Sequence, residues 1–330
     1  MLKRFVGFLG FVSLVTCSLI SARANAATVD FTGTWSGTIS GQLQCPSGGT
    51  SLQTLDVTGS FLQSGDVVNG VSSARGSCIG DDLILPIGAT ISGATITSTS
   101  YSKNGTLQIT ASVSGTAMSV SVAFVDQSGI PRSLSGILNR TSSQPPSSSL
   151  SGTYTGTYTY TFDDPQNAVG CQNPPIHTFT SSGNGSITVL QIGAFAMISA
   201  SFPNVQKVFG DGHGNCWIGP KDRGWVGSGT VNGNVISPQG YPPFGPWFLT
   251  VNGNTLATTF GERAEIEFGE IVFNGTRTST SIPPIVASFT ASKSTIDPGE
   301  STTLTWSVLA ATSVSIDNGV GAQPLSGGAR

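Results

Sequence analysis

The chain contains very little charge. Only 9% of its 330 residues are Asp, Glu, Lys or Arg, whereas about 25% is usual for a soluble protein. Serine, threonine and 43 glycines provide polarity instead. Because no cluster of basic residues is present, the sequence predicts no nucleic-acid partner.

Histidine and cysteine are also scarce, with two and five residues respectively. Neither a Cys-x-x-Cys pair nor a group of histidines occurs, so we expect no metal and no cofactor. No serine or cysteine nucleophile motif accompanies His177 or His213, and a catalytic triad is therefore not predicted.

Long apolar runs are missing except at the N-terminus, where Phe5–Ile20 follows Lys3 and Arg4 and precedes Ala24–Ala26. This order is typical of a secretory signal peptide over residues 1–26, cleaved after Ala26. Its removal takes away three basic residues and no acid, so the formal net charge changes from −3 to −6. We expect an exported protein, in the periplasm, at the cell surface or in the medium, with no membrane insertion after cleavage.

What the chain does contain is an internal repeat. Phe31–Thr38 (FTGTWSGT) recurs as Leu150–Thr157 (LSGTYTGT), at an offset of 119 residues. Further along, Leu62–Gly65 matches Leu190–Gly193 at an offset of 128. The rising offset predicts two copies of one domain, the second with longer connections.

The repeat also selects a disulfide pairing. Once Cys17 leaves with the signal peptide, four cysteines remain, and four cysteines allow three pairings. The repeat places one pair at equivalent positions in each copy. We therefore predict the disulfides Cys45–Cys78 and Cys171–Cys216, each stabilising its copy by about 3–4 kcal/mol on the chain-entropy model.

Both copies have the pattern of short β-strands. In Thr106–Val113 apolar and polar residues alternate, which indicates a half-buried strand. Glycine-containing pairs that break such runs predict turns, namely those at Gly65, Asn69–Gly70, Gly93, Gly129, Asn184–Gly185, Gly233 and Gly253. We expect an all-β protein without an amphipathic helix.

Antiparallel strands in series must hide their edges, and consecutive hairpins favour an up-and-down barrel of about eight strands. The opening Gly33-Thr34-Trp35 resembles the Gly-x-Trp start of lipocalin-like barrels, which implies a lipocalin-like meander with Trp35 closing one end. The predicted domains are barrel copy 1 at 27–142, a Pro/Ser linker at 143–149, barrel copy 2 at 150–279 and a second linker at 280–284.

Residues 285–330 have a different pattern. A Pro298-Gly299 turn precedes Leu304-Thr305-Trp306, and Ala311–Ile316 reads ATSVSI. This segment resembles the first half of the Ig-like modules of bacterial exported surface proteins, which implies a β-sandwich with Trp306 in its core. Since such a sandwich needs about 100 residues, we expect an incomplete Ig-like domain and a truncated gene.

The candidate binding residues lie where the second copy is longer. Phe202–Trp225 reads as a Gly-rich connection that carries Trp217 and Trp225, and Pro238–Trp247 as a proline-stiffened loop. Exposed aromatic rings on rigid loops suit stacking on sugars or anchoring a protein partner. The alternative is that these rings pack beneath their own loops. The predicted ligand-binding residues are Trp225, Tyr241, Phe244 and Trp247.

A third possibility concerns Glu265–Glu270 (EIEFGE), which resembles the Glu-x-Asp-x-x-Glu strand of laminarinase-like glycosidases. The resemblance implies Glu265 and Glu270 as the paired carboxylates of a retaining enzyme, although Glu267 replaces the central Asp. We favour a non-catalytic binding or surface-display protein with an extracellular glycan or protein as its partner. A structural spacer of a larger surface protein and a glycoside hydrolase are the alternatives.

Overall fold

The computed structural model describes residues 29–45, 49–78, 83–102, 105–125, 129–163, 178–210, 213, 215–239, 248–264, 267–293, 295–297 and 300–329. All regular elements in these ranges are β-strands, and the all-β prediction is confirmed. Within the same ranges no helix is long and apolar enough to cross a membrane.

The first copy is a closed eight-stranded antiparallel barrel in which each strand pairs with the next and the last returns to the first. This part of the fold prediction is confirmed. The strands are β1 (Gly33–Gln44), β2 (Thr50–Ser64), β3 (Val67–Arg75), β4 (Leu83–Ser92), β5 (Thr95–Ser102), β6 (Gly105–Ser114), β7 (Ala117–Val125) and β8 (Pro131–Ser142).

The next eight strands form a second sheet that also closes on itself, because β9 pairs with both β10 and β16. Its strands are β9 (Gly152–Asp163), β10 (Thr178–Ile192), β11 (Phe195–Gly210), β12 (Cys216–Asn232), β13 (Val235–Gln239), β14 (Leu249–Asn252), β15 (Thr255–Ala264) and β16 (Glu267–Ser279). The order of pairing along the chain is the same as in the first barrel.

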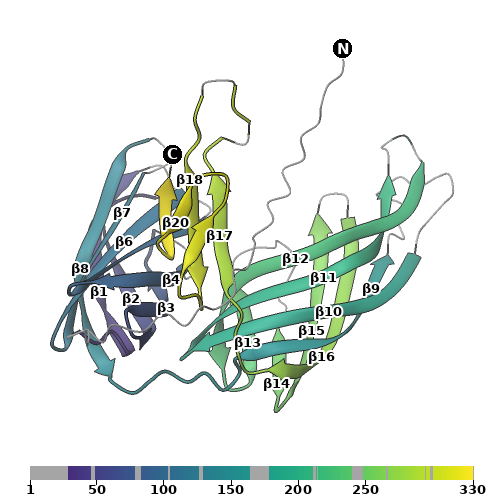
Figure 1. The fold of residues 1–330 in the computed structure, drawn as a ribbon, viewed down its shortest axis with the longest axis horizontal. Coiled ribbons are helices and arrows are strands. Elements are labelled where there is room, and N and C mark those ends of the chain that lie inside the picture. Colours follow the sequence, from purple (N-terminus) through teal and green to yellow (C-terminus); the bar gives the residue numbers. More distant parts are fainter. Residues whose placement is uncertain are drawn as a thin grey trace.

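The C-terminal segment forms two small sheets. One contains β17 (Ile285–Ala291), β18 (Leu304–Leu309) and β21 (Ser326–Ala329); the other contains β19 (Val314–Ile316) and β20 (Gly321–Gln323). In Figure 1 these strands, in yellow and yellow-green, lie between the first barrel on the left and the second on the right.

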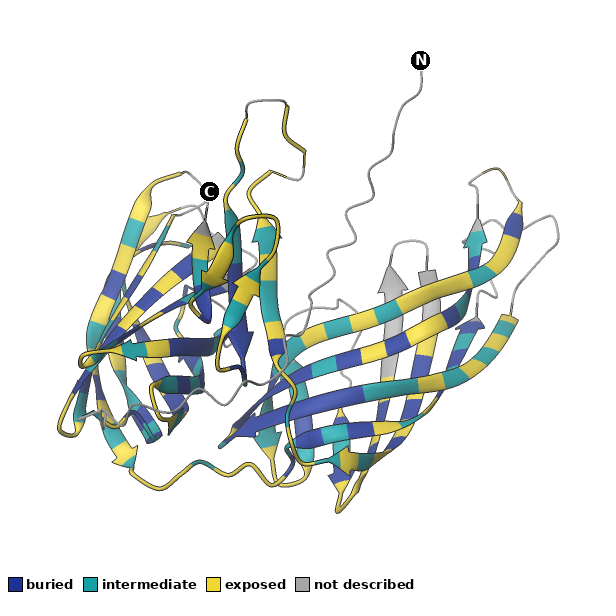
Figure 2. Cartoon of the chain, in the orientation of Figure 1, coloured by how far each residue is buried: buried dark blue, intermediate teal, exposed yellow. Residues whose placement is uncertain are grey.

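Alternation along the strands sends apolar residues inward. Leu107, Ile109 and Val113 of β6 are buried, while Thr106 and Gln108 are exposed. Figure 2 shows the resulting bands of buried and exposed residues along the strands of both barrels. The first core is mainly aliphatic around one tryptophan, whereas the second contains several aromatic rings, including Tyr154, Tyr158, Tyr160, Phe162, Phe202 and Phe273.

The turn predictions were right at some glycines and wrong at two. Gly65 and Gly233 have φ values of 59° and 60° and occupy two-residue turns, where a side chain would be strained. Gly70 lies within β3, however, and Gly185 within β10. At these two positions a Cβ atom would overlap the ring of a core phenylalanine, so glycine makes room for the aromatic core instead of turning the chain.

Both barrels are closed at one end by the same hydrogen bonds from equivalent aromatic residues. Trp35 is buried, and its Nε1–H donates to the carbonyl of Phe31 at 3.0 Å. Tyr154 is buried at the matching position and donates from its hydroxyl to the carbonyl of Leu150 at 2.8 Å. The indole and the phenol each satisfy their polar group four residues back along the chain.

An arginine covers each of these rings. The Arg140 guanidinium lies 4.5 Å from the Trp35 ring centroid, and Arg277 lies 5.1 Å from that of Tyr154. Arg140 also forms an ion pair with Asp30 at 3.1 Å, whereas the Arg277 Nε–H donates to the Tyr154 hydroxyl at 3.0 Å. Cation–π contacts thus brace the closed end of both barrels.

A glutamine completes each end. The Gln63 side-chain oxygen accepts from the Phe31 N–H at 2.9 Å, and the Gln191 oxygen accepts from the Leu150 N–H at 2.9 Å. Each glutamine then donates from Nε2 to the carbonyl of the glycine two residues later. The sequence repeat therefore corresponds to a repeated network of side chains and not only to a repeated strand order.

One predicted disulfide is present in full. Cys45 and Cys78 are bonded, with Cα atoms 4.9 Å apart, so this prediction is confirmed. Cys216 is also disulfide-bonded, and its predicted partner Cys171 lies outside the described residues.

The two barrels and the C-terminal sheet share one apolar cluster, which we call the junction. Its barrel members lie on outer walls; Met197, for example, is flanked by Ala196 and Ile198, which belong to the core of the second barrel. The junction consists of Val71 and Ile84 of the first barrel, Leu190, Ile192, Phe195 and Met197 of the second, and Ile285 and Leu309 of the C-terminal segment.

The C-terminal sheet also fills a gap in the first barrel. Strands β4 and β5 pair only at Ile91–Ile96 and Ser92–Thr95. Beyond these pairs, the backbone N–H of Thr99 on β5 donates to the Ser326 hydroxyl at 3.0 Å. On the β4 side, a Cβ atom at Gly88 would overlap a carbonyl oxygen of β18. The segment is therefore built into the wall of the barrel.

Replacing Leu309 with Ala should destabilise the folded chain by about 2–5 kcal/mol, because this fully buried side chain (0% exposed) leaves a cavity in the junction. Chemical denaturation would measure the change. The matched control is Leu52→Ala at a position that is 69% exposed, where we expect a change within about 0.5 kcal/mol. Equal effects of the two substitutions would contradict the role given to the junction.

Candidate binding face of the second barrel

The two barrels differ most at one hairpin. Strands β11 and β12 contain 16 and 17 residues, whereas their counterparts β3 and β4 contain 9 and 10. Strand β13 pairs only with Ser228–Asn232 of β12. Along its first twelve residues, β12 therefore has no paired neighbour on that side among the described residues, and the hairpin extends beyond the shorter strands at the right of Figure 1.

The prediction of a long loop over Phe202–Trp225 was wrong. Cross-strand pairing continues from Phe195–Thr230 to Gly210–Cys216, with one irregularity between Phe202 and Val205. Gly219 and Gly224 lie within β12 and do not end it. Just beyond this segment, Gly227 makes room for a ring, because a Cβ atom there would overlap the indole of Trp225.

The irregularity is a β-bulge at Pro203–Asn204. Asn204 has a φ of 53°, and its N–H donates to the Asp222 carboxylate at 2.8 Å. The carbonyl of Pro203 accepts from the Tyr158 hydroxyl at 3.2 Å. The extra residue of a bulge increases the local twist and redirects the strand, and these two hydrogen bonds fix its position.

Register shows which side chains share the inward face of the hairpin. Directly paired residues lie on the same face of a sheet, and Ala200, Phe202 and Val205 belong to the core of the second barrel. Their partners Trp225, Arg223 and Lys221 are therefore on the inward face. Beyond the bulge, the pairs Lys207–Gly219 and Phe209–Trp217 keep the register of this face, while Val208 and Cys216, which alternate with them, also belong to the core cluster.

At the far end of this face, two aromatic rings are stacked. The Phe209 and Trp217 centroids are 5.8 Å apart, with an interplanar angle of 15°. The Lys221 ammonium lies 6.0 Å from the Phe209 centroid, and Trp217 remains 51% exposed. The neighbouring disulfide-bonded Cys216 ties down the start of the strand. An exposed indole thus stacks on a ring that also contacts a cation.

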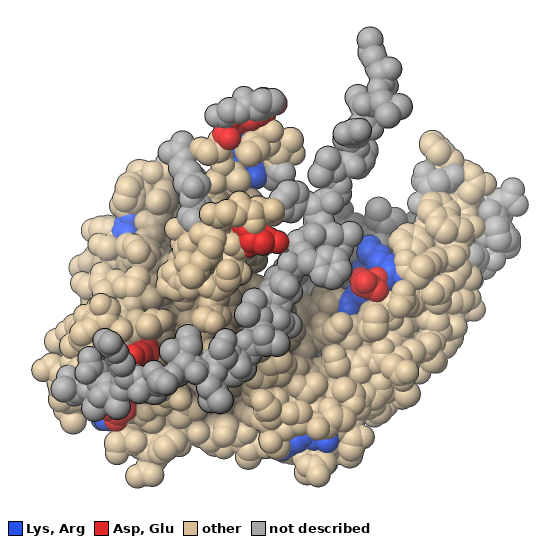
Figure 3. Space-filling model, viewed as in Figure 1, with Lys and Arg blue, Asp and Glu red and all other residues tan. Residues whose placement is uncertain are grey.

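Charge is concentrated on the same strand. Of the cations on the hairpin, Lys207 is buried (1% exposed), Arg223 is half-buried and Lys221 is exposed. Figure 3 shows basic side chains around an acidic one over β12, on a face that is otherwise largely uncharged. The acid of this strand, Asp222, alternates to the other face and accepts the hydrogen bond from Asn204.

The predicted site residues are only partly described. Trp225 is half-buried and packs against the core of the second barrel. Tyr241, Phe244 and Trp247 lie outside the described residues, as does Glu265. Glu270 lies on β16 and is exposed, next to the buried Ile271.

Phe209, Lys221 and Arg223 were not predicted as site residues. A usable pattern was present in the sequence, since Trp217, Lys221, Arg223 and Trp225 all occupy odd positions and alternate residues of a strand share a face. The intervening Gly219 and Gly224 resemble the glycines of a loop and obscure this alternation in the sequence.

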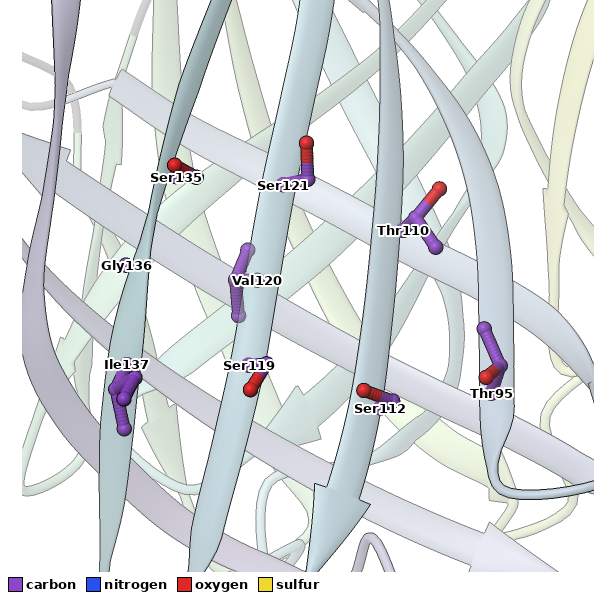
Figure 4. A pocket seen from close by; sticks show the side chains of 9 residues that line it. All are labelled: Thr95, Thr110, Ser112, Ser119, Val120, Ser121, Ser135, Gly136 and Ile137. Atoms are coloured by element: carbon purple, nitrogen blue, oxygen red, sulfur yellow. The ribbon is translucent and has the colours of Figure 1, made fainter.

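Two shallow hollows occur elsewhere on the described surface. The first lies across β5–β8 on the outer wall of the first barrel. Figure 4 shows that short serine and threonine side chains surround Val120, Gly136 and Ile137 there. The second lies across β9–β11 and is lined in a similar way by Thr155, Thr157, Asn184, Ser186 and Ser201. Neither hollow brings titratable groups together.

Metal ligands are not grouped in the described part of the chain, where no three His, Cys, Asp or Glu side chains come together. Comparison with known proteins does not identify a family for this chain. No protein-family model matches the chain, and no curated protein matches it either. One solved structure, a protein of unknown function from the DUF3598 family of Nostoc punctiforme, aligns with 75% of this chain and 96% of its own. At 13% identity and a TM-score of 0.22, this likeness supports no conclusion about the fold or the function.

Burial raises the pKa of the Tyr154 and Tyr158 hydroxyls, and in Tyr154 the hydrogen bond and charge of Arg277 partly oppose the shift. A tyrosine whose pKa is raised by folding contributes its full stability below the unfolded pKa, near about 10, and loses it as the pH rises through the folded value. We therefore expect the chain to lose stability above a pH of about 10.

Absorbance of tyrosinate, followed against pH together with circular dichroism, would test this expectation. Of the five tyrosines, Tyr154 and Tyr158 should ionise at a higher pH than an ordinary exposed phenol, because burial raises their pKa. Ionisation of all five near the usual phenol pKa, with the fold retained, would contradict the burial of these hydroxyls.

Proposed function

We propose that this chain is an exported, non-catalytic binding or surface-display protein whose second barrel recognises an extracellular glycan. The observation that carries the proposal is the Phe209–Trp217 stack, in which an indole is held half-exposed at the end of the inward face of β11 and β12. A fixed aromatic face suits the apolar side of a sugar ring, and little entropy is lost when a pre-oriented ring meets its ligand.

The difference between the copies supports this assignment. The barrels share strand order and closing residues, and the lengthened hairpin belongs to the second alone. Binding residues often lie on additions carried by a rigid scaffold. Trp225, at the base of the same face, would then support the site from below.

We further propose that the two barrels are tandem lipocalin-like copies and that the C-terminal segment is part of an Ig-like domain. The matching contacts of Trp35 with Arg140 and of Tyr154 with Arg277 support the first point. For the second, the support is the antiparallel β17–β18–β21 sheet, which buries Trp306. The Cys45–Cys78 disulfide is compatible with an oxidising compartment and therefore with export.

A structural spacer within a larger surface protein is the second candidate. The observation that favours it is the junction, in which one apolar cluster joins all three parts of the chain. A unit fixed in this way would hold its ends at a defined separation. The spacer function and glycan binding are compatible in one protein.

Replacing Trp217 with Ala tests the proposed function. Retention of the full chain on a panel of insoluble and immobilised polysaccharides should fall at least tenfold, since the stacking surface is lost. The melting temperature should change little, because about half of the ring is already exposed. The matched control is Phe289→Ala on β17, which removes another exposed ring (55% exposed) that is not part of the hairpin.

Two results on the polysaccharide panel would contradict the proposed function. If the unmodified chain is retained on no polysaccharide, or if Trp217→Ala and Phe289→Ala reduce retention equally, glycan recognition by the hairpin is wrong. A large loss of stability on Trp217→Ala would instead assign the ring to the core.

A further inference from the structure

We propose that the glycan is acidic, with sugar units that carry carboxylates, and that Lys221 binds a carboxylate while a neighbouring sugar ring stacks on Trp217. This inference rests on the proposed glycan-binding function and adds the chemical class of the ligand. Its basis is the presence of an exposed indole and an exposed ammonium on one face of β12.

The geometry of β12 places the two groups in line. Trp217 and Lys221 are four residues apart and share the inward face, so they are about 13 Å apart along the strand. Gly219 lies between them and presents no side chain. The Phe209 ring lies against Gly219, so a polymer that runs along the strand would pass over the indole and this ring before it reaches the ammonium.

Lys221 is available for such a contact. Its described neighbour is the ring of Phe209 at 6.0 Å, which leaves its N–H donors directed to solvent or ligand. Phe209 contacts both Lys221 and Trp217, and so it holds the cation and the platform in one unit. Lys207 is buried on the same face and is not available as a ligand contact.

The acid next to Lys221 in the sequence is hydrogen-bonded to the backbone of the bulge. Asp222 faces the other side of the strand and is held by the Asn204 N–H at 2.8 Å. The chain as a whole has a negative formal charge of −3, so a polyanion would be repelled elsewhere and attracted only locally. Binding that arises in this way should weaken as salt screens the attraction.

An acidic glycan fits these features better than a nucleic acid. Nucleic-acid binding draws most of its affinity from many basic side chains along the phosphate backbone, and only 14 Lys and Arg are spread over the 330 residues. A single cation and a single exposed indole on one strand match a polymer in which one sugar unit stacks and a nearby unit carries a carboxylate. A neutral glycan would use the indole and leave the ammonium without a partner.

Polygalacturonate and its fully methyl-esterified form provide a matched pair of probes, since they share a backbone and differ in charge. The full chain should bind polygalacturonate at least tenfold more tightly than the ester at low ionic strength, and the difference should shrink in salt. Lys221→Gln should remove the preference and keep binding to the ester. Trp217→Ala should weaken binding to both polymers. Lys293→Gln, an exposed lysine of the C-terminal segment, is the control and should change neither affinity.

The outcomes separate the two proposals. Equal binding of both polymers, unchanged by Lys221→Gln, would overturn the acidic ligand and leave glycan binding intact. Failure to bind polygalacturonate, with retention on neutral polysaccharides that depends on Trp217, would do the same. Loss of all polysaccharide binding would overturn both. A single-stranded oligonucleotide that binds with the same dependence on Trp217 and Lys221, in place of polygalacturonate, would assign the face to nucleic acid.

Discussion

The arrangement of the whole chain depends on burial of one apolar cluster that no single domain could bury alone. Val71 of the first barrel, Met197 of the second and Leu309 of the C-terminal segment are each buried in the junction, although the first two lie on outer walls. A barrel by itself would expose these side chains to water, and contiguous exposed apolar surface favours association with other surfaces. The three parts therefore stabilise one another, and the position of the β11–β12 hairpin relative to the first barrel follows from this contact.

Much of the scaffold was predictable because its causes are local or repeated. Period-two alternation identified strands such as Thr106–Val113, and the repeated Gly-Thr-aromatic opening located both barrels and the disulfide Cys45–Cys78. The closing contacts of Trp35 and Tyr154 follow the same repeat. Residues with equivalent structural roles occur at matching positions of the two repeats, so aligning the repeats identifies them.

The features that the sequence did not predict depend on contacts between residues far apart in the chain. Gly185 was predicted to turn the chain, yet it accommodates the Phe202 ring in the core. The sequence alone does not distinguish a glycine needed for a positive φ from one needed for space. The shared face of the β11–β12 hairpin was not predicted for a related reason. Phe209 and Trp217 are brought together by a strand register that depends on the bulge at Asn204. The outward apolar residues of the junction interrupt the alternation of apolar and polar residues, and the sequence does not show what buries them.

The gap between β4 and β5 has a consequence for how the molecule is made. The backbone of Thr99 finds its partner in Ser326, 227 residues later in the sequence. A ribosome delivers the first barrel long before β21 exists, and loops of that length close slowly. Until then, part of the β5 edge is open to any passing strand. The first barrel is thus the first to be synthesised and the last to be sealed, which makes the interval between these two events the time when the chain most needs a chaperone.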